Sequence, residues 1–274
     1  MIAAFLAVPA LLRGGASSPA LALLCLACGA YGLADDVLAL PAAAKLALQL
    51  CLALLATLFL GRAEAFSFFG YTVSLGALSA PLTALWIVFM MNAVNLTDGM
   101  DGLCAGTSAV SAAALALLLF AHGAWEQALS ASALSGVCLG FLFHNRAPAG
   151  IFMGETGSAF LGFALAVLAL PLFSAEVHAP LPAVLPAFLF PLGEAASSFL
   201  RRVSRGKNPF APDKKHMHHV LYAGGFSVPL VCAVLYAFSL LCALCAVAYE
   251  HHAAAALAAF AAAVVFIRVM LSRK

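Results

Sequence analysis

Apolar stretches of about 20 residues recur along the chain, and short segments between them carry most of its charges. A transmembrane helix needs roughly 20 mainly apolar residues. We predict nine spans, at 18–34, 43–61, 79–93, 102–121, 127–143, 157–173, 180–199, 227–248 and 253–271. Residues 1–12 form a tenth apolar segment, which is too short to cross a membrane alone. Because 65% of the 274 residues are hydrophobic and 9% are charged, a soluble core of this size is excluded.

The sequence therefore predicts an all-α, polytopic membrane protein with about ten transmembrane helices, forming a single domain over residues 1–274. When the chain is threaded through a bilayer, 11 of the 13 lysines and arginines fall on one side. The positive-inside rule makes that side cytoplasmic. All five aspartates (35, 36, 98, 101 and 213) fall on the same side. We therefore expect one site at the cytoplasmic face, and nothing in the charge pattern indicates a nucleic-acid partner.

Residues 92–103 place Asn92, Asn95, Asp98 and Asp101 at three-residue steps where an apolar segment ends. This spacing puts the side chains on roughly one face of a helical turn. Carboxylate and amide oxygens suit a hard cation such as Mg²⁺, which usually brings a phosphate with it. The alternative is a helix end capped by Asn and Asp.

Three further polar clusters lie in the predicted cytoplasmic loops. The first is Asp35-Asp36, whose adjacent carboxylates repel and need a metal or a cationic partner, with Lys45 as a candidate. The alternative is a solvated helix end. The second is 151–158, where free amides at a helix start could hold a phosphate and Glu155 a cation. Its alternative is an ordinary helix cap.

The third cluster, 201–219, combines six Lys or Arg residues with three histidines. We interpret His216, His218 and His219 as hydrogen-bond donors to phosphates, because no cysteine lies in this loop to complete a zinc site. The alternative for its Arg and Lys side chains is binding to anionic lipid headgroups. Glu194, near the end of a span, is either a buried functional group or a partner of Arg201 or Arg202. Together these clusters indicate phosphoryl-type transfer at the membrane surface.

Five blocks of the sequence, in order over roughly 20–230, resemble the polyprenyl-phosphate N-acetylhexosamine-1-phosphate transferases of glycosyltransferase family 4. The matching blocks are 32–36, 75–83, 92–103, 152–158 and 209–219. The resemblance implies transfer of a sugar phosphate, most simply GlcNAc-1-phosphate, from a UDP-N-acetylhexosamine to undecaprenyl phosphate with release of UMP. It also implies Mg²⁺ or Mn²⁺ as cofactor, a multi-pass enzyme of the bacterial plasma membrane that acts in cell-envelope polysaccharide synthesis, and a homodimer.

The resemblance assigns roles residue by residue. Asp35 and Asp36 match the aspartate pair proposed to deprotonate or orient the lipid phosphate. Asp98 and Asp101 match the nucleotide pocket, and Phe152 matches an aromatic that stacks on uracil. Catalytic roles are thus expected for Asp35, Asp36, Asp98, Asp101, His216, His218 and His219. Metal binding is expected for Asn95 and Glu155, and substrate binding for Lys45, Asn92, Phe152, Arg201, Arg202 and Lys214.

The chain departs from the family pattern in four places. Glu155 stands where most relatives have Asp, Ala39 where a third acid often follows the pair, and Lys214 where they have Arg. Lys keeps the charge of Arg but loses its bidentate fork. The sequence starts in a segment that resembles the second span of relatives, so we expect their first span to be missing or truncated here. These departures leave open an inactive relative, and the phospho-MurNAc-pentapeptide branch is an alternative to the GlcNAc branch. An ion-coupled transporter is a distant alternative. The acids of such a transporter should lie near the membrane midplane, whereas only Glu194 is a candidate for that position here.

Overall fold

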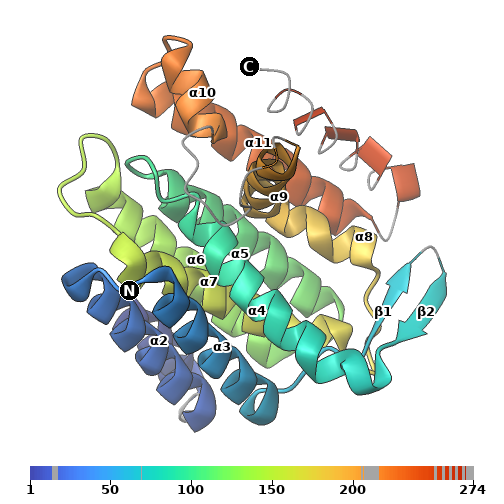
Figure 1. The fold of residues 1–274 in the computed structure, drawn as a ribbon. Coiled ribbons are helices and arrows are strands. Elements are labelled where there is room, and N and C mark those ends of the chain that lie inside the picture. The colour runs from blue at the N-terminus through green and yellow to red at the C-terminus, as the bar shows by residue number, and fades with distance from the viewer. Residues whose placement is uncertain are drawn as a thin grey trace.

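The computed structural model describes residues 1–13, 18–68, 70–204, 206, 216–249 and 252–254, with isolated residues from there to 269. The chain folds into a bundle of long helices that run roughly side by side (Figure 1). The helices are α1 (Ile2–Arg13), α2 (Pro19–Leu38), α3 (Ala42–Phe59), α4 (Ser79–Asn95), α5 (Leu103–Ala121), α6 (Trp125–Asn145), α7 (Gly154–Leu168), α8 (Leu181–Val184), α9 (Leu189–Val203), α10 (Met217–Ala223) and α11 (Val228–Ala248).

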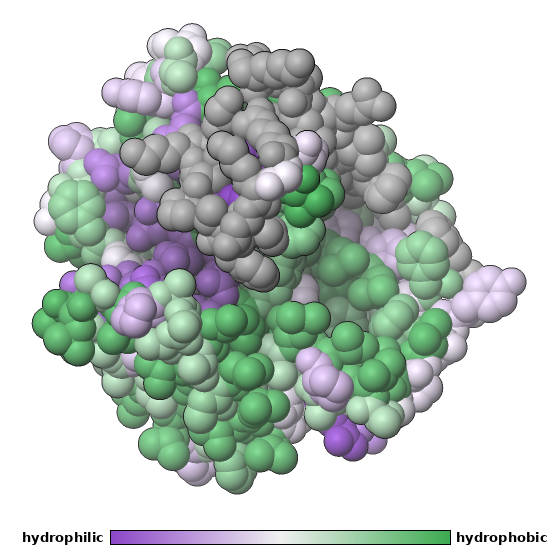
Figure 2. All heavy atoms as spheres, viewed as in Figure 1, coloured by the Kyte–Doolittle hydropathy of each residue, from purple (hydrophilic) through white to green (hydrophobic). Residues whose placement is uncertain are grey.

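Eight helical stretches in the described part of the chain are long and apolar enough to cross a membrane. They correspond to the first eight predicted spans, which confirms an all-α polytopic membrane protein. The ninth predicted span, 253–271, lies only partly within the described residues, and those that are described there are helical. The outer helix faces expose apolar side chains such as Leu23, Leu58 and Phe59, as expected where lipid replaces water. Figure 2 shows this apolar surface in green over much of the visible face.

Helix α7 forms the centre of the bundle, where it packs against α2 and α4. Its side chains from Gly157 to Leu168 are all buried, because this segment is apolar around its whole circumference. The crossing with α2 is very close. A Cβ atom at Gly32 would lie 2.4 Å from the Cα of Thr156, so only glycine fits there. This crossing brings the end of α2, with Asp35 and Asp36, to the start of α7.

The span predicted at 180–199 is interrupted. Helix α8 is followed by the 3₁₀ turn η3 (Leu185–Phe188) and then by α9. Two further 3₁₀ turns are η1 (Gly76–Leu78) and η2 (Leu170–Phe173). Pro182, Pro186 and Pro191 recur along the interrupted segment, and each removes a backbone donor from a continuous helix.

The segment 62–78, which lies between two predicted spans, contains a β-hairpin. Strands β1 (Ala65–Phe68) and β2 (Tyr71–Ser74) pair antiparallel, with Phe68 opposite Tyr71. The hairpin is tied to the 173–180 segment because the Glu64 N–H donates to the Phe173 carbonyl (2.8 Å). It lies at the end of the bundle away from α10 (Figure 1). Threading of the chain assigns the loops 62–78 and 174–179 to the non-cytoplasmic side, and the two loops meet at one end of the bundle.

Candidate active site

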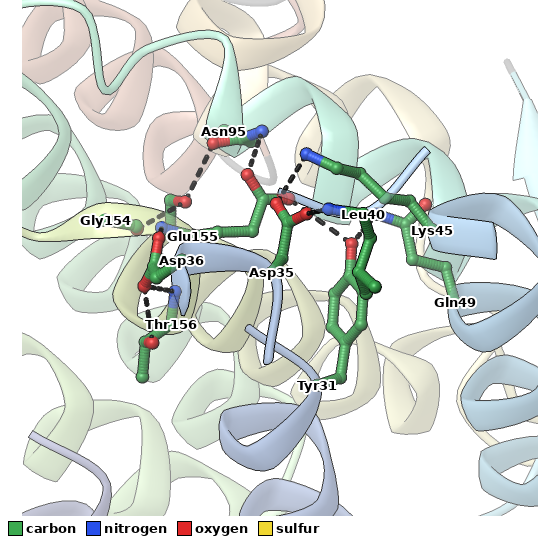
Figure 3. A network of polar contacts seen from close by, with 11 residues as sticks. Tyr31, Asp35, Asp36, Leu40, Lys45, Gln49, Asn95, Gly154, Glu155 and Thr156 are labelled. Carbon is green, nitrogen blue, oxygen red and sulfur yellow. Dashed lines mark hydrogen bonds and ion pairs between the residues drawn. The ribbon is translucent and has the colours of Figure 1, made fainter. Parts of the chain in front are cut away.

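Hydrophilic residues gather at the other end of the bundle, below α10 (Figure 2). Here the C-terminal ends of α2 and α4 meet the N-terminal end of α7, and Figure 3 shows their side chains in one polar network. The three loops predicted to share the cytoplasmic side therefore converge. The network joins five of the residues expected from the sequence: Asp35, Asp36, Lys45, Asn95 and Glu155.

The two adjacent aspartates have different partners. Asp35 is buried and forms an ion pair with Lys45, the cationic partner expected from the sequence. The other Asp35 oxygen, Oδ1, accepts a hydrogen bond from the Leu40 N–H (2.9 Å). Asp35 therefore has a cation beside it that solvent reaches, because the Lys45 side chain is one-third exposed.

Asp36 points instead at the first turn of α7. Its Oδ1 accepts from the Glu155 N–H (2.8 Å), and its Oδ2 accepts from the N–H (3.0 Å) and the hydroxyl (2.6 Å) of Thr156. The first amides of a helix lack intrahelical partners, and a carboxylate satisfies them while also complementing the helix dipole. Asp36 is thus an N-terminal cap supplied by another helix. This corrects the expectation that the α7 amides hold a phosphate, because Asp36 occupies two of them.

Glu155 is held at both carboxylate oxygens. Oε1 accepts a hydrogen bond from the Tyr31 hydroxyl (3.3 Å), and Oε2 accepts one from the Asn95 side-chain amide (2.8 Å). The Ser158 hydroxyl in turn donates to Asn95 Oδ1 (2.9 Å). The two residues expected to bind the metal are therefore in direct contact.

A second layer of polar side chains lies behind Glu155. The Gln49 amide donates to the Tyr31 hydroxyl (3.0 Å), and the Asn92 amide donates to Gln49 Oε1 (2.7 Å). Asn92 was expected to bind substrate, but its described contacts are with Gln49 and its own helix. The sequence analysis missed Tyr31 and Gln49. The signal available for Gln49 was a polar residue inside an apolar span, which usually has a functional reason.

Asp98 and Asp101 lie beside this network with different environments. Asp98 accepts a hydrogen bond from the Gly154 N–H, yet burial, followed by the charges of Asp36 and Glu155, raises the pKa of its carboxyl to about 7. Asp101 Oδ2 accepts from the Ala149 N–H (3.0 Å), which fixes the loop 146–153. Asp98 is thus a carboxyl that is readily protonated at neutral pH and gains from a nearby cation.

The histidines of α10 complete this end of the bundle. The His216 and His218 rings are buried and nearly parallel, with centroids 5.6 Å apart, and the His219 ring lies 4.2 Å from that of His218. Neither ring nitrogen of His218 has a hydrogen-bond partner among the described residues. Burial lowers the pKa of His218 to about 3. A buried, unpartnered and neutral imidazole is costly unless a ligand satisfies it.

His218 also lies against the 92–103 run. A Cβ atom at Gly99 would be only 2.3 Å from His218 Nε2. The absence of a side chain at Gly99 therefore lets the histidine ring approach the backbone next to Asp98. This contact joins the histidine cluster to the carboxylate cluster.

The other expected residues differ in how far they are exposed. Phe152 is 78% exposed at the edge of the site, where a planar ligand has access to its ring. Arg201 is buried and Arg202 is half-buried at the end of α9. Lys214 lies outside the described residues, as does the rest of 207–215. Glu194 contacts His216 and the Met217 N–H.

The oxygen-rich chemistry of this site fits a magnesium ion in part. Within the residues that the structure covers, no group of three or more His, Cys, Asp or Glu side chains is arranged to hold a metal. Mg²⁺, however, usually uses one or two carboxylates and completes its shell with water and substrate phosphates. Glu155 offers a carboxylate oxygen, and Asn95 offers an amide oxygen that here accepts from Ser158 while its amide nitrogen faces Glu155.

Comparison with known proteins agrees with this geometry. The family model described as glycosyl transferase family 4 matches residues 18–172. A probable undecaprenyl-phosphate N-acetylglucosaminyl 1-phosphate transferase of Bacillus subtilis is 35% identical over 209 residues, covering 75% of this chain and 58% of that relative. A phospho-N-acetylmuramoyl-pentapeptide-transferase of Heliobacterium modesticaldum is 43% identical over 171 residues, covering 61% of this chain and 51% of the relative.

A decaprenyl-phosphate N-acetylglucosaminephosphotransferase of Mycobacterium tuberculosis is 34% identical over 180 residues, covering 58% of this chain and 45% of the relative. The site and the fold thus define an integral membrane protein with a polar, carboxylate-rich site at one end of its helical bundle. The chain belongs to glycosyl transferase family 4. It spans about half the length of the curated relatives it matches.

Proposed function

We propose that this protein transfers a phospho-N-acetylhexosamine from a UDP-sugar to undecaprenyl phosphate at the cytoplasmic face of the bacterial plasma membrane. The observation that carries the proposal is the gathering of four polar residues at one end of the bundle. Asp36 and Asn95 are hydrogen-bonded to Glu155, and the adjacent Asp35 is paired with Lys45. Family membership supplies the reaction class. A transporter is not supported, because these acids lie at one end of the bundle and not near its middle.

In this reaction an oxygen of the lipid phosphate attacks the β-phosphorus of the UDP-sugar, and the bridging bond to the α-phosphate breaks so that UMP leaves. In this proposal Asp35, which is paired with Lys45, takes or holds the proton of the lipid phosphate, while Lys45 neutralises its charge. Neutral His218 is able to donate one N–H to a phosphate oxygen. Positioning and charge neutralisation dominate this type of catalysis.

Mg²⁺ is the cofactor we propose, with Glu155 and Asn95 as its protein ligands, and when bound it neutralises the diphosphate of the donor. Glu155 keeps the charge of the aspartate found in most relatives. Tyr31 and Asn95 hold the longer side chain at both oxygens, so the substitution does not by itself indicate an inactive relative. The gathering of Asp36, Asp98 and Glu155 supports a cation at this site, because burial, followed by the charges of Asp36 and Glu155, raises the pKa of Asp98.

UDP-GlcNAc is the donor we favour, because the His-x-His-His pattern at 216–219 resembles that branch and two of the relatives described above act on N-acetylglucosamine by name. The name of the Heliobacterium relative makes UDP-MurNAc-pentapeptide the second candidate.

The test is UMP release by the purified protein in lipid nanodiscs that contain undecaprenyl phosphate. UDP-GlcNAc and UDP-MurNAc-pentapeptide are supplied separately, with Mg²⁺, with Mn²⁺ or with EDTA. We expect release from UDP-GlcNAc with either metal, none with EDTA and none from the Asp35→Asn variant. Absence of UMP with both donors, from protein that unfolds cooperatively on heating, would reject the proposed function.

A further inference from the structure

Glu194 is a fully buried carboxylate that the proposed chemistry does not use. It lies in α9, the helix that follows the interrupted part of the seventh span, and its side chain has no solvent exposure. Burying a carboxylate is costly unless it is hydrogen-bonded. Its contacts therefore indicate why this residue is present in an apolar segment.

Both oxygens of Glu194 contact the start of α10. Oε1 accepts a hydrogen bond from the Met217 N–H (2.8 Å), and Oε2 lies 3.0 Å from Nδ1 of the His216 ring. The Met217 N–H is the donor in its contact, because a backbone N–H only donates. A carboxylate only accepts, so Nδ1 of His216 must carry the proton in the contact with Oε2.

We propose that Glu194 is a positioning residue that holds the His216 ring in its Nδ1–H form and presents Nε2 to the substrate. Nε2 is on the opposite edge of the ring from Glu194, and the same ring stacks on His218, whose two nitrogens lack partners among the described residues. In the neutral Nδ1–H tautomer, Nε2 has a free lone pair that can accept a hydrogen bond or a proton. The role of Nε2 rests on the proposed function, whereas the tautomer does not.

The geometry explains why one residue serves two purposes. By binding the Met217 N–H, Glu194 fixes the start of α10, and by binding Nδ1 it fixes the rotation of the His216 ring. A carboxylate that orients a histidine in this way acts through the ring and not on the substrate. Glu194 would then set the geometry of the whole histidine cluster, because the three rings contact one another.

The Glu194→Gln variant changes the tautomer expected for His216 while it keeps the shape of the side chain at position 194. The amide oxygen of Gln still accepts from the Met217 N–H, and this leaves the amide NH₂ group facing Nδ1 of His216. Since an NH₂ group only donates, Nδ1 must become the acceptor and the proton must move to Nε2. The variant thus keeps the packing and the bond to the start of α10, but it moves the ring proton of His216 from Nδ1 to Nε2.

The first measurement is long-range ¹H–¹⁵N NMR of histidine-labelled protein in nanodiscs at about pH 8, which distinguishes the two tautomers. The His216→Gln variant assigns the His216 signals. We expect a proton on Nδ1 in the wild type and Nε2–H in Glu194→Gln. Absence of a proton on Nδ1 in the wild type, or an unchanged spectrum in the variant, would overturn the proposal.

The second measurement is UMP release. We expect Glu194→Gln to lower kcat by about 100-fold or more, since a wrong histidine tautomer is strongly inhibitory in comparable carboxylate–histidine pairs. Glu194→Asp keeps the acceptor charge and should retain the Nδ1–H form with activity above that of Glu194→Gln. The matched control is Ser197→Ala, which removes a buried hydroxyl that donates to the Glu194 carbonyl (3.0 Å) without touching the histidines.

The outcomes distinguish this inference from the proposed function. If wild-type protein releases no UMP, the proposed function fails while the NMR spectra still test Glu194. If wild-type protein is active and Glu194→Gln is equally active, the positioning role of Glu194 is rejected and the proposed function stands.

Discussion

Asp36 accepts hydrogen bonds from both the backbone N–H and the hydroxyl of Thr156, at 3.0 and 2.6 Å, across 120 positions of the chain. Its neighbour Asp35 is instead paired with Lys45. Two adjacent carboxylates that look equivalent in the sequence thus have separate structural roles. Asp36 organises the first turn of α7, whereas Asp35 retains the cationic partner that an acceptor phosphate also needs.

This difference predicts the behaviour of Asp36→Asn. The substituted NH₂ group cannot accept a hydrogen bond, so one of the two α7 amides loses its partner. Unfolding should therefore become easier by about 1–2 kcal/mol, as for loss of one hydrogen bond to a charged group. Turnover should fall as well, because Glu155 lies in the same turn. Thermal unfolding and UMP release check both effects.

Thr156→Val is the matched control, because it removes only the hydroxyl bond to Asp36 and keeps both backbone bonds. We expect a smaller loss of stability than in Asp36→Asn. An unchanged unfolding midpoint in Asp36→Asn together with complete loss of turnover would contradict a capping role and assign Asp36 to the chemical step.

The sequence was sufficient to predict the eight spans and the gathering of three loops, because apolar length and charge asymmetry act on each segment independently. It was not sufficient to predict which residue faces which. The occupied amides of α7 depend on the close crossing at Gly32, which is a property of two segments together. The hairpin at 65–74 was missed because its short strands, held by contacts to 173–180, give a weak local signal.

Tyr31→Phe tests the layer of side chains behind the proposed metal ligands. The change removes the hydroxyl that donates to Glu155 and accepts from Gln49. Loss of a residue that orients a metal ligand typically lowers metal affinity 10–100-fold, and we expect a decrease of about tenfold here. Mn²⁺ binding followed by electron paramagnetic resonance gives a readout that is independent of turnover.

Tyr71→Phe provides the control for the Tyr31 substitution, since this hydroxyl lies on the exposed strand β2 at the other end of the bundle. Its Mn²⁺ affinity should equal that of the wild type. If Tyr31→Phe also binds Mn²⁺ as tightly as the wild type, Tyr31 has no part in holding Glu155 for a metal.

Glu155→Asp tests whether the site is built around the longer acid. Glu155 reaches Tyr31 with one oxygen and Asn95 with the other. An aspartate is one methylene shorter and should lose at least one of these contacts, so we expect Mn²⁺ affinity and turnover to fall by roughly tenfold. Titration of Mn²⁺ and UMP release are the measurements. If the Asp variant binds Mn²⁺ more tightly than the wild type, the site is not built around the longer side chain of Glu155.

The pH dependence of stability should report the burial of His218. Burial lowers its pKa from the ordinary 6.5 to about 3. Between these values the unfolded chain binds a proton that the folded protein does not, so stability is lost as the pH falls from about 6.5 toward 3. This histidine contributes at most about 1.4 kcal/mol per pH unit.

Thermal unfolding of wild type and His218→Asn between pH 7.5 and 5 checks this expectation. The wild-type midpoint should fall more steeply with acidification than that of the variant. His144→Asn, which replaces an exposed histidine at the end of α6, should retain the wild-type slope. Equal slopes for wild type and His218→Asn would contradict a buried, neutral His218.

Gly99→Ala tests the contact that joins the histidine cluster to the carboxylates. The new Cβ would lie 2.3 Å from His218 Nε2, and the ring must move because the backbone of the 92–103 run is held by its own contacts. Displacement of a catalytic group by about 1 Å costs on the order of 100-fold in rate. We therefore expect turnover to fall by about that factor while the unfolding midpoint changes little. Gly136→Ala in α6, where a Cβ meets open space, should leave turnover unchanged. Full activity of Gly99→Ala would show that His218 is not required at its present distance from Asp98.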